Sequence, residues 1–149
     1  MNYLFNISAI LISTISSYQS YRDRSGFAAK ALQKYYALKH LLFTIVTSSD
    51  IHLHARIGAR LSLPHPNGVV MHADAIIGDD CMIMQQVTIG QLASGGAPRL
   101  GNRIYVGAGA KILGAITIGD GARIGANSVV LIDVPAGATA VGVPASIKS

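Results

Sequence analysis

The hydrophobic positions of this chain recur every six residues. Six branched aliphatic residues follow one another at that spacing without a gap: Leu100, Val106, Ile112, Ile118, Ile124 and Val130. The same spacing holds upstream through Met71, Ile77, Ile83 and Ile89, and before that through Ile51, Ile57 and Leu63. This period fits neither an amphipathic helix nor an ordinary alternating strand. It predicts a mostly β solenoid, a parallel β-helix of four to five coils, in which each coil has three short flat faces.

Glycine follows four of these aliphatic residues directly, namely Gly101, Gly107, Gly119 and Gly125. Since glycine tolerates backbone conformations that other residues avoid, we expect these glycines to form the tight corners between two faces.

The six-residue spacing is broken twice. Leu63 and Met71 are eight residues apart, which places two extra residues around His65 in the stretch LPHPNGVV. Ile89 and Leu100 are eleven residues apart, which predicts a loop extruded over residues 90–99. Insertions in repeat proteins usually collect on the binding face. We therefore expect both interruptions to lie near a functional site.

The segments on either side of the repeats have a different character. Residues 1–49 are predicted to form a short N-terminal helical segment divided near Ser25 and Gly26, residues 50–134 the β-helix, and residues 135–149 a C-terminal cap. The apolar stretch 4–15 is too short to span a bilayer. We expect it to pack on protein, with weak membrane contact as the alternative.

Composition narrows the range of functions. The net charge is +5 and the pI about 9.6, but no dense run of lysine and arginine with interleaved aromatic residues is present, so we expect no nucleic-acid partner. The single cysteine, Cys81, cannot form an internal disulfide and favours a reducing, cytoplasmic location. It occupies a small inward position of its repeat, so we expect it to fill the core.

The segments DIHLHARIG, LPHPNGVV, QQVTIG, VGAGAKILGAITIGDGARIGANSVV and AVGVPA together resemble the hexapeptide-repeat acyltransferases, in particular their serine acetyltransferase-like branch. This resemblance extends from Asp50 to Ile147. It implies a left-handed parallel β-helix, a homotrimer with active sites between subunits, and acetyl-CoA as co-substrate. Because few residues precede the coils, we expect a simple trimer in place of a dimer of trimers.

The resemblance also implies roles for individual residues. His65 matches the histidine that activates an acceptor hydroxyl, and Asp50 matches the aspartate that holds it. Imidazole titrates near neutral pH, and a carboxylate fixes its tautomer, so this pair suits general-base catalysis with direct acetyl transfer. The family likeness places coenzyme A against the main chain at Gly90, Ala108 and Ala126. Lys111 and Arg123 are the candidates for contacting its phosphates.

Two departures from the family pattern bear on the acceptor. Pro64 replaces an aspartate before the histidine, and the shortened loop GGAPRL lacks an arginine–histidine pair. Both features help to hold the charged groups of serine in the family. We therefore expect a sugar hydroxyl of a surface polysaccharide as acceptor, at the inner face of the membrane. Serine acetylation is the first alternative, and a non-catalytic scaffold the second. An antibiotic-modifying acetyltransferase is less favoured, because those relatives usually have a longer loop.

The remaining histidines suggest no metal site. His52 and His54 lie close to His65 in sequence, but their spacing matches no common zinc pattern. We expect His52, His54 and His72 to be surface or corner residues, and no metal cofactor.

Overall fold

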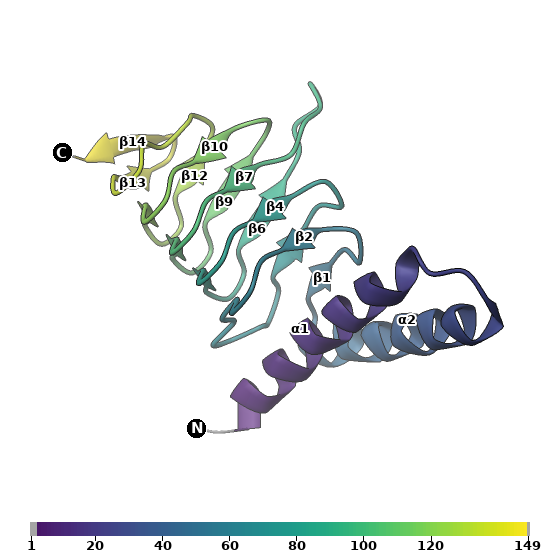
Figure 1. The fold of residues 1–149 in the computed structure, drawn as a ribbon. Helices are drawn as coiled ribbons and strands as arrows, with labels where there is room; N and C mark the ends of the chain where they lie inside the picture. Colours follow the sequence, from purple (N-terminus) through teal and green to yellow (C-terminus); the bar gives the residue numbers. More distant parts are fainter. Residues whose placement is uncertain (1–2, 149) are drawn as a thin grey trace.

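The computed structural model describes residues 3–148, with side chains from residue 7 onwards. Two helices precede a β solenoid, so the predicted fold class is confirmed (Figure 1). The helices are α1 (Tyr3–Arg22) and α2 (Phe27–Thr47). The strands are β1 (Asp50–Ile51), β2 (Arg56–Ile57), β3 (Val70–Met71), β4 (Ile76–Ile77), β5 (Met82–Ile83), β6 (Thr88–Gly90), β7 (Arg99–Leu100), β8 (Tyr105–Val106), β9 (Lys111–Leu113), β10 (Thr117–Ile118), β11 (Arg123–Ile124), β12 (Val129–Val130), β13 (Thr139–Gly142) and β14 (Ala145–Lys148).

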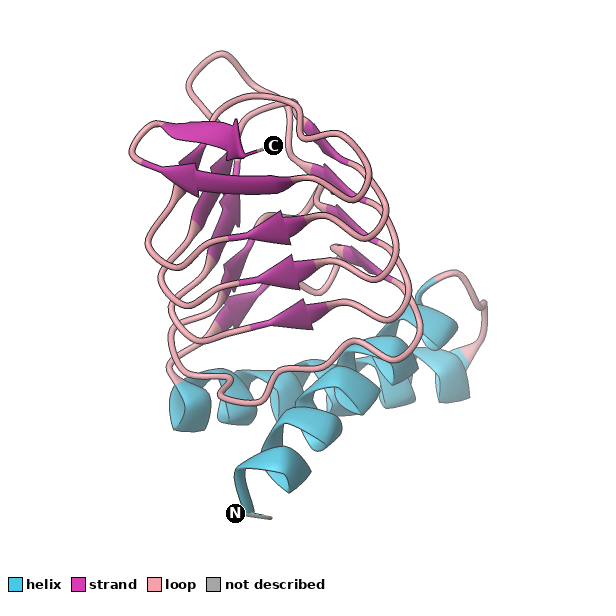
Figure 2. Cartoon of the chain, turned by 90° about the vertical axis from the view of Figure 1, so that its left-hand side faces the viewer, coloured by secondary structure: helices cyan, strands magenta, loops and turns pink. Residues whose placement is uncertain are grey.

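The strands form the three faces of a prism. Sheet A has the order β1-β3-β6-β9-β12, sheet B the order β10-β7-β4-β2, and sheet C the order β14-β13-β11-β8-β5. Neighbouring strands are parallel except β13 and β14, which form an antiparallel pair at the C-terminal end. Figure 2 shows the coils stacked above the helices.

Strand pairing locates both interruptions of the repeat. In sheet A, Asp50 pairs with Val70, Val70 with Thr88, and Thr88 with Lys111. The steps are 20, 18 and 23 residues, so two extra residues precede β3 and five extra residues lie between β6 and β9. The second insertion leaves sheet A after Gly90 and projects from the prism as a loop (Figure 1).

The interior of the prism is filled by the aliphatic residues of the six-residue repeat. Residues of this set that are 3% exposed or less include Ile51, Leu63, Met71, Ile77, Ile83, Ile89, Leu100, Val106, Ile112, Ile118, Ile124 and Val130. Cys81 is completely buried among them, as expected for core packing. Its thiol donates to the carbonyl of Gly101 at 3.2 Å, and burial raises its pKa.

The glycines after the aliphatic residues serve a different purpose from the one predicted. None of Gly101, Gly107, Gly119 and Gly125 has a positive φ. A Cβ atom on Gly107 would instead lie 2.6 Å from the backbone nitrogen of Ala126 in the next coil. These positions therefore require glycine because successive coils approach closely.

Left-handed backbone occurs further along two of the corners, both at glycines and at residues that carry side chains. Arg60, Asp80 and Arg103 have φ values of 57°, 58° and 55°, and each lies two residues before a position that pairs on sheet C, namely Ser62, Met82 and Tyr105. The Arg60 guanidinium donates to both carboxylate oxygens of Asp80, at 2.6 and 2.7 Å. This exposed pair raises the pKa of Arg60 and lowers that of Asp80, in each case chiefly through the side-chain hydrogen bond.

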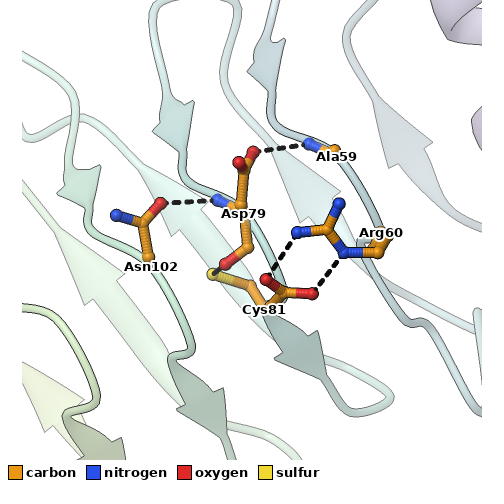
Figure 3. A network of polar contacts seen from close by, with 6 residues as sticks. Ala59, Arg60, Asp79, Cys81 and Asn102 are labelled. Atoms are coloured by element: carbon orange, nitrogen blue, oxygen red, sulfur yellow. Dashed lines mark hydrogen bonds and ion pairs between the residues drawn. The ribbon is translucent and has the colours of Figure 1, made fainter.

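A ladder of side-chain acceptors links the coils along the same corner (Figure 3). Asp79 Oδ1 accepts from the backbone N–H of Ala59 at 2.7 Å, and Asn102 Oδ1 accepts from that of Asp79 at 2.9 Å. Asp120 Oδ1 continues the ladder by accepting from the backbone N–H of Asn102 at 2.9 Å. The backbone hydrogen bond from Asn102 is also the chief cause of the lowered pKa of Asp120.

The helices close the N-terminal end of the prism. Leu11 and Ile15 of α1 are buried in the same apolar cluster as Ile51 and Leu63. The Gln19 side chain donates to the carbonyl oxygens of residues 53 and 55, at 3.1 and 2.7 Å. In the part of stretch 4–15 whose side chains are described, α1 thus packs on protein. No helix within residues 3–148 is both long and apolar enough to cross a membrane.

Candidate active site

His65 lies at the corner where the chain passes from sheet C to sheet A. This corner forms a column of left-handed residues, one per coil: Ser48, Gly68, Gln86, Gly109 and Asn127. Gly68 N–H donates to the carbonyl of Ser48 at 3.1 Å, and Gln86 N–H to that of Asn67 at 2.9 Å. The backbone of the insertion is therefore held by the coils on either side, while the imidazole of His65 is exposed to solvent.

Asp50 lies on the same edge of sheet A, one coil earlier. It is the first residue of β1, and its N–H donates to the carbonyl of Val69 at 2.8 Å. Its carboxylate is exposed. No hydrogen bond or ion pair joins Asp50 to His65 in the described part of this single chain. Their pairing in catalysis stays a prediction.

Asp50 lines a hollow on the outer side of sheet A. The hollow has a volume of about 290 Å³ and is bordered by Asp50, His52, Val70, Met71, His72, Ala73, Ile89 and Gly90. It unites Asp50 with Gly90, the predicted contact for coenzyme A. His65 is not among these lining residues. The hollow is bordered instead by His52 and His72, which we expected to be surface or corner residues.

His52 and His72 occupy equivalent positions in successive coils. Nδ1 of His52 accepts from the N–H of His54 at 3.1 Å, and Nδ1 of His72 from the N–H of Asp74 at 3.2 Å. In the neutral rings, Nε2 therefore carries the proton and is available as a donor. The sequence contains a signal for this pair. His52 in IHLHA and His72 in MHADA are twenty residues apart, and Ile51 pairs with Met71 across the same interval.

His40 of α2 is a third histidine beside Asp50. Its Nε2–H donates to the carbonyl of Ile51 at 2.8 Å and so ties the helix to β1. Burial lowers the pKa of His40, opposed by the hydrogen bond to Ile51 and by the charge of Asp50. This contact could not be predicted from the sequence, because His40 lies within a helix whose periodicity is unrelated to that of the coils.

The predicted contacts for coenzyme A are distributed over one corner and two faces. Ala108 and Ala126 stack at the corner that precedes sheet A, where Asn127 N–H donates to the carbonyl of Ala108 at 2.8 Å. Lys111 extends from sheet A, and its ammonium donates to the carbonyl of Gln86 at 2.8 Å. Arg123 lies on sheet C, with its guanidinium 4.9 Å from the centre of the Tyr105 ring. The two cations thus lie on different faces of one chain.

The described residues contain no group of three or more histidine, cysteine, aspartate or glutamate side chains arranged to hold a metal ion. His52 and His54 contact each other edge to face, with ring centres 5.1 Å apart, and His54 stacks on Tyr18 of α1. These ring contacts explain the position of the His54 side chain without a metal ligand role.

A parallel β-helix with an exposed histidine on an inserted corner defines a class, the hexapeptide-repeat transferases. Residues 97–131 match the family model described as "Bacterial transferase hexapeptide (six repeats)". A serine acetyltransferase of Helicobacter pylori is 45% identical over 128 residues, which cover 84% of this chain and 71% of that protein. The chain therefore belongs to the serine acetyltransferase family of the hexapeptide-repeat acyltransferases, as the sequence motifs predicted.

Solved structures agree with this assignment. "Soybean Serine Acetyltransferase Complexed with Serine" superposes with a TM-score of 0.82 at 36% identity, covering 99% of this chain and 58% of that one. A Brucella abortus serine acetyltransferase in complex with coenzyme A gives a TM-score of 0.82 at 32% identity, covering 97% of this chain and 56% of that one. The chain thus spans less than two thirds of either solved protein.

The expectation of a polysaccharide sugar as acceptor is wrong. Curated relatives that are 45–48% identical are serine acetyltransferases. The expectation relied on two missing features of the family pattern, at Pro64 and in the loop. Those losses change individual groups near the acceptor, whereas the identity extends over most of the coils. A glycan partner and membrane contact through residues 4–15 gain no support either.

Proposed function

We propose that this protein is a serine O-acetyltransferase, which transfers the acetyl group of acetyl-CoA to the hydroxyl of L-serine. The observation that carries the proposal is the 45% identity to the Helicobacter pylori serine acetyltransferase across 84% of this chain. The exposed His65 on its inserted corner supplies the general base that this chemistry requires.

The reaction needs a single proton carrier. His65 takes the proton of the serine hydroxyl while the oxygen attacks the thioester carbonyl of acetyl-CoA. The tetrahedral intermediate then collapses, the C–S bond breaks, and the imidazolium returns its proton to the departing thiolate. Asp50 stabilises the imidazolium and orients the ring. Neither an acyl-enzyme nor the buried Cys81 takes part.

The test is acetyl-CoA turnover measured by release of free thiol. Purified protein should release coenzyme A with L-serine but much more slowly with 2-aminoethanol, which lacks the carboxylate. His65→Ala should lower kcat by at least about a thousandfold, because general-base catalysis and orientation of the hydroxyl are lost together. Arg103→Ala serves as the matched control and should retain full activity, because Arg103 is exposed at the corner before sheet C, away from His65.

Two outcomes would contradict the proposal. Serine-dependent turnover that survives in His65→Ala would remove His65 from the mechanism. If neither serine nor any other small hydroxyl compound released coenzyme A, the chain would be a scaffold that retains the family fold.

The donor site is proposed along sheet A and its preceding corner. Small residues at Gly90, Ala108 and Ala126 allow the pantetheine arm to approach the backbone, and Lys111 and Arg123 contact phosphate groups. Support comes from the coenzyme A bound to the Brucella abortus relative. Lys111 and Arg123 lie on different faces of one prism, so a coenzyme A between adjacent subunits would meet Lys111 of one copy and Arg123 of the other.

A homotrimer is proposed as the assembly that completes these sites. Support comes from α2, whose C-terminal half presents large apolar side chains to solvent in the single chain. Leu38, Leu41, Leu42, Ile45 and Val46 are 53–67% exposed. An apolar strip of this kind is typical of an interface between copies. A cytoplasmic location is proposed on the free thiol of Cys81, which suits a reducing compartment.

A further inference from the structure

A second hollow lies on sheet B, next to the end of α1, and is rich in arginine. It has a volume of about 440 Å³ and is bordered by Arg22, His54, Arg56, Ala73, Asp74, Ile76 and Arg99. The arginines come from three distant segments, namely α1, β2 and β7. We call this the sheet B hollow. It meets the hollow of Asp50 at Ala73, which borders both.

Strand register fixes the spacing of its two central arginines. Arg56 pairs with Ile76, and Ile76 pairs with Arg99, so the arginines stand on either side of Ile76 on the outer face of sheet B. Two strand spacings place their Cα atoms about 10 Å apart. An oxyanion over Ile76 can be reached by both guanidinium groups, each of which offers a planar fork of donors.

The charge of the hollow is poorly balanced by protein groups. Asp74 is the carboxylate among its lining residues, and it lies 3.8 Å from Nδ1 of His72. Arg22 pairs with Asp23 at 3.4 Å. Arg56 and Arg99 make no ion pair within the described residues.

The corner before sheet C provides a contrast. There Arg60 is matched to Asp80, and the Arg103 guanidinium lies 3.9 Å from an Asp120 carboxylate oxygen. The arginines of this corner are thus paired with carboxylates. Arg56 and Arg99 are left as like charges facing one hollow.

We propose that the sheet B hollow binds a multivalent oxyanion of the phosphate or sulfate type. Arg56 and Arg99 hold the anion from opposite sides of Ile76, while Arg22 contributes positive charge at the rim. Such an anion can be free in solution or can be a phosphate of coenzyme A.

The first test titrates the full-length protein with sodium sulfate and with sodium phosphate by calorimetry, with ionic strength held constant by chloride. We expect saturable binding of both anions. The double variant Arg56→Gln/Arg99→Gln should weaken it at least tenfold, because each arginine contributes charge-assisted hydrogen bonds. Arg103→Gln is the matched control and should leave binding unchanged.

A conservative variant guards against a folding defect. Arg99→Lys keeps the charge and the fold but loses the planar fork, and should weaken binding by a smaller factor than Arg99→Gln. Binding that is equal in the wild-type protein and in the correctly folded double variant would overturn the proposal. So would a sulfate titration that shows no saturation in the wild-type protein.

A second pair of titrations identifies the source of the anion. If the site takes a phosphate of coenzyme A, sulfate should compete with coenzyme A, and the double variant should bind coenzyme A more weakly but pantetheine equally well. If the site takes a free anion, coenzyme A affinity should be unchanged while the sulfate difference persists. These binding readouts do not depend on acetyl transfer, so they distinguish failure of this proposal from failure of the proposed function.

Discussion

At the scale of single residues, His40 links the helical segment to the site. Burial holds its pKa below the ordinary histidine value of 6.5, so the folded chain favours the neutral ring. The unfolded chain takes up this proton at a higher pH than the folded chain does. The resulting stabilisation is fully present above about pH 6.5 and is lost as the pH falls through the folded pKa.

We therefore expect the stability of the protein to fall between pH 7.5 and pH 5.5, measured as the urea midpoint. His40→Gln keeps a side-chain donor for the Ile51 carbonyl but cannot titrate. It should show a smaller loss of stability over the same interval. Asp80 and Asp120, whose pKa values are lowered, lose their contributions only at more acidic pH and do not interfere. Parallel pH profiles for the two proteins would exclude His40 as the titrating group.

Lys111 provides a residue-scale test of the donor site. If its ammonium contacts a phosphate of coenzyme A, Lys111→Gln should raise KM for acetyl-CoA about tenfold and leave kcat nearly unchanged. The effect should disappear with acetyl-pantetheine, which lacks the phosphates. Lys148→Gln, in the C-terminal strand β14, provides the control. An equal loss with both donors would assign Lys111 a structural role, through its hydrogen bond to the Gln86 carbonyl.

At the scale of single elements, the contact between successive coils limits which residues can follow an inward aliphatic. A Cβ atom on Gly78 would lie 2.5 Å from the carbonyl oxygen of Gly101, a backbone atom that cannot move without disturbing β7. We expect Gly78→Ala to reduce the free energy of unfolding by about 1–3 kcal/mol, the usual cost of overpacking. Chemical denaturation monitored by circular dichroism measures this change.

Gly90→Ala is the matched control for this substitution. Its Cβ atom would lie 3.4 Å from a Leu113 methyl carbon, which is ordinary contact, and its φ is not in the left-handed region. The control should change stability little. Equal destabilisation by both substitutions would show that the close approach of coils at Gly78 does not determine the cost.

The coils were predictable because one rule repeats. Each inward aliphatic must fill the same prism, so the spacing of Leu100 to Val130 is sufficient to place β7 to β12, and a break in spacing locates His65 and the loop. The residues that meet across coils were not predictable. Arg22, Arg56 and Arg99 share a hollow only because α1 ends beside sheet B. His40 reaches Ile51 only because α2 packs beneath β1.

At the scale of the whole molecule, the helices leave an apolar surface that the single chain does not cover. Leu41 and Ile45 of α2 are 53% and 67% exposed, whereas Leu11 and Ile15 of α1 are buried against the first coil. No aspartate or glutamate occurs in α2, so its exposed face offers apolar contact without a carboxylate to exclude a neighbour. In the proposed trimer this surface lies against another copy of the chain.

Replacing both Leu41 and Ile45 by lysine tests this arrangement. Buried lysines would be costly at an interface but harmless on a solvated helix, so the double variant should dissociate into monomers that remain folded. Light scattering coupled to gel filtration gives the mass directly, and circular dichroism checks the fold.

Ile147→Lys, which replaces an exposed apolar residue of β14, is the control and should leave the trimer intact. If sites between subunits are required for turnover, the dissociated variant should lose serine-dependent activity while circular dichroism shows that its coils are still folded. A wild-type protein that is monomeric and active would exclude the trimer and place the complete site within one chain.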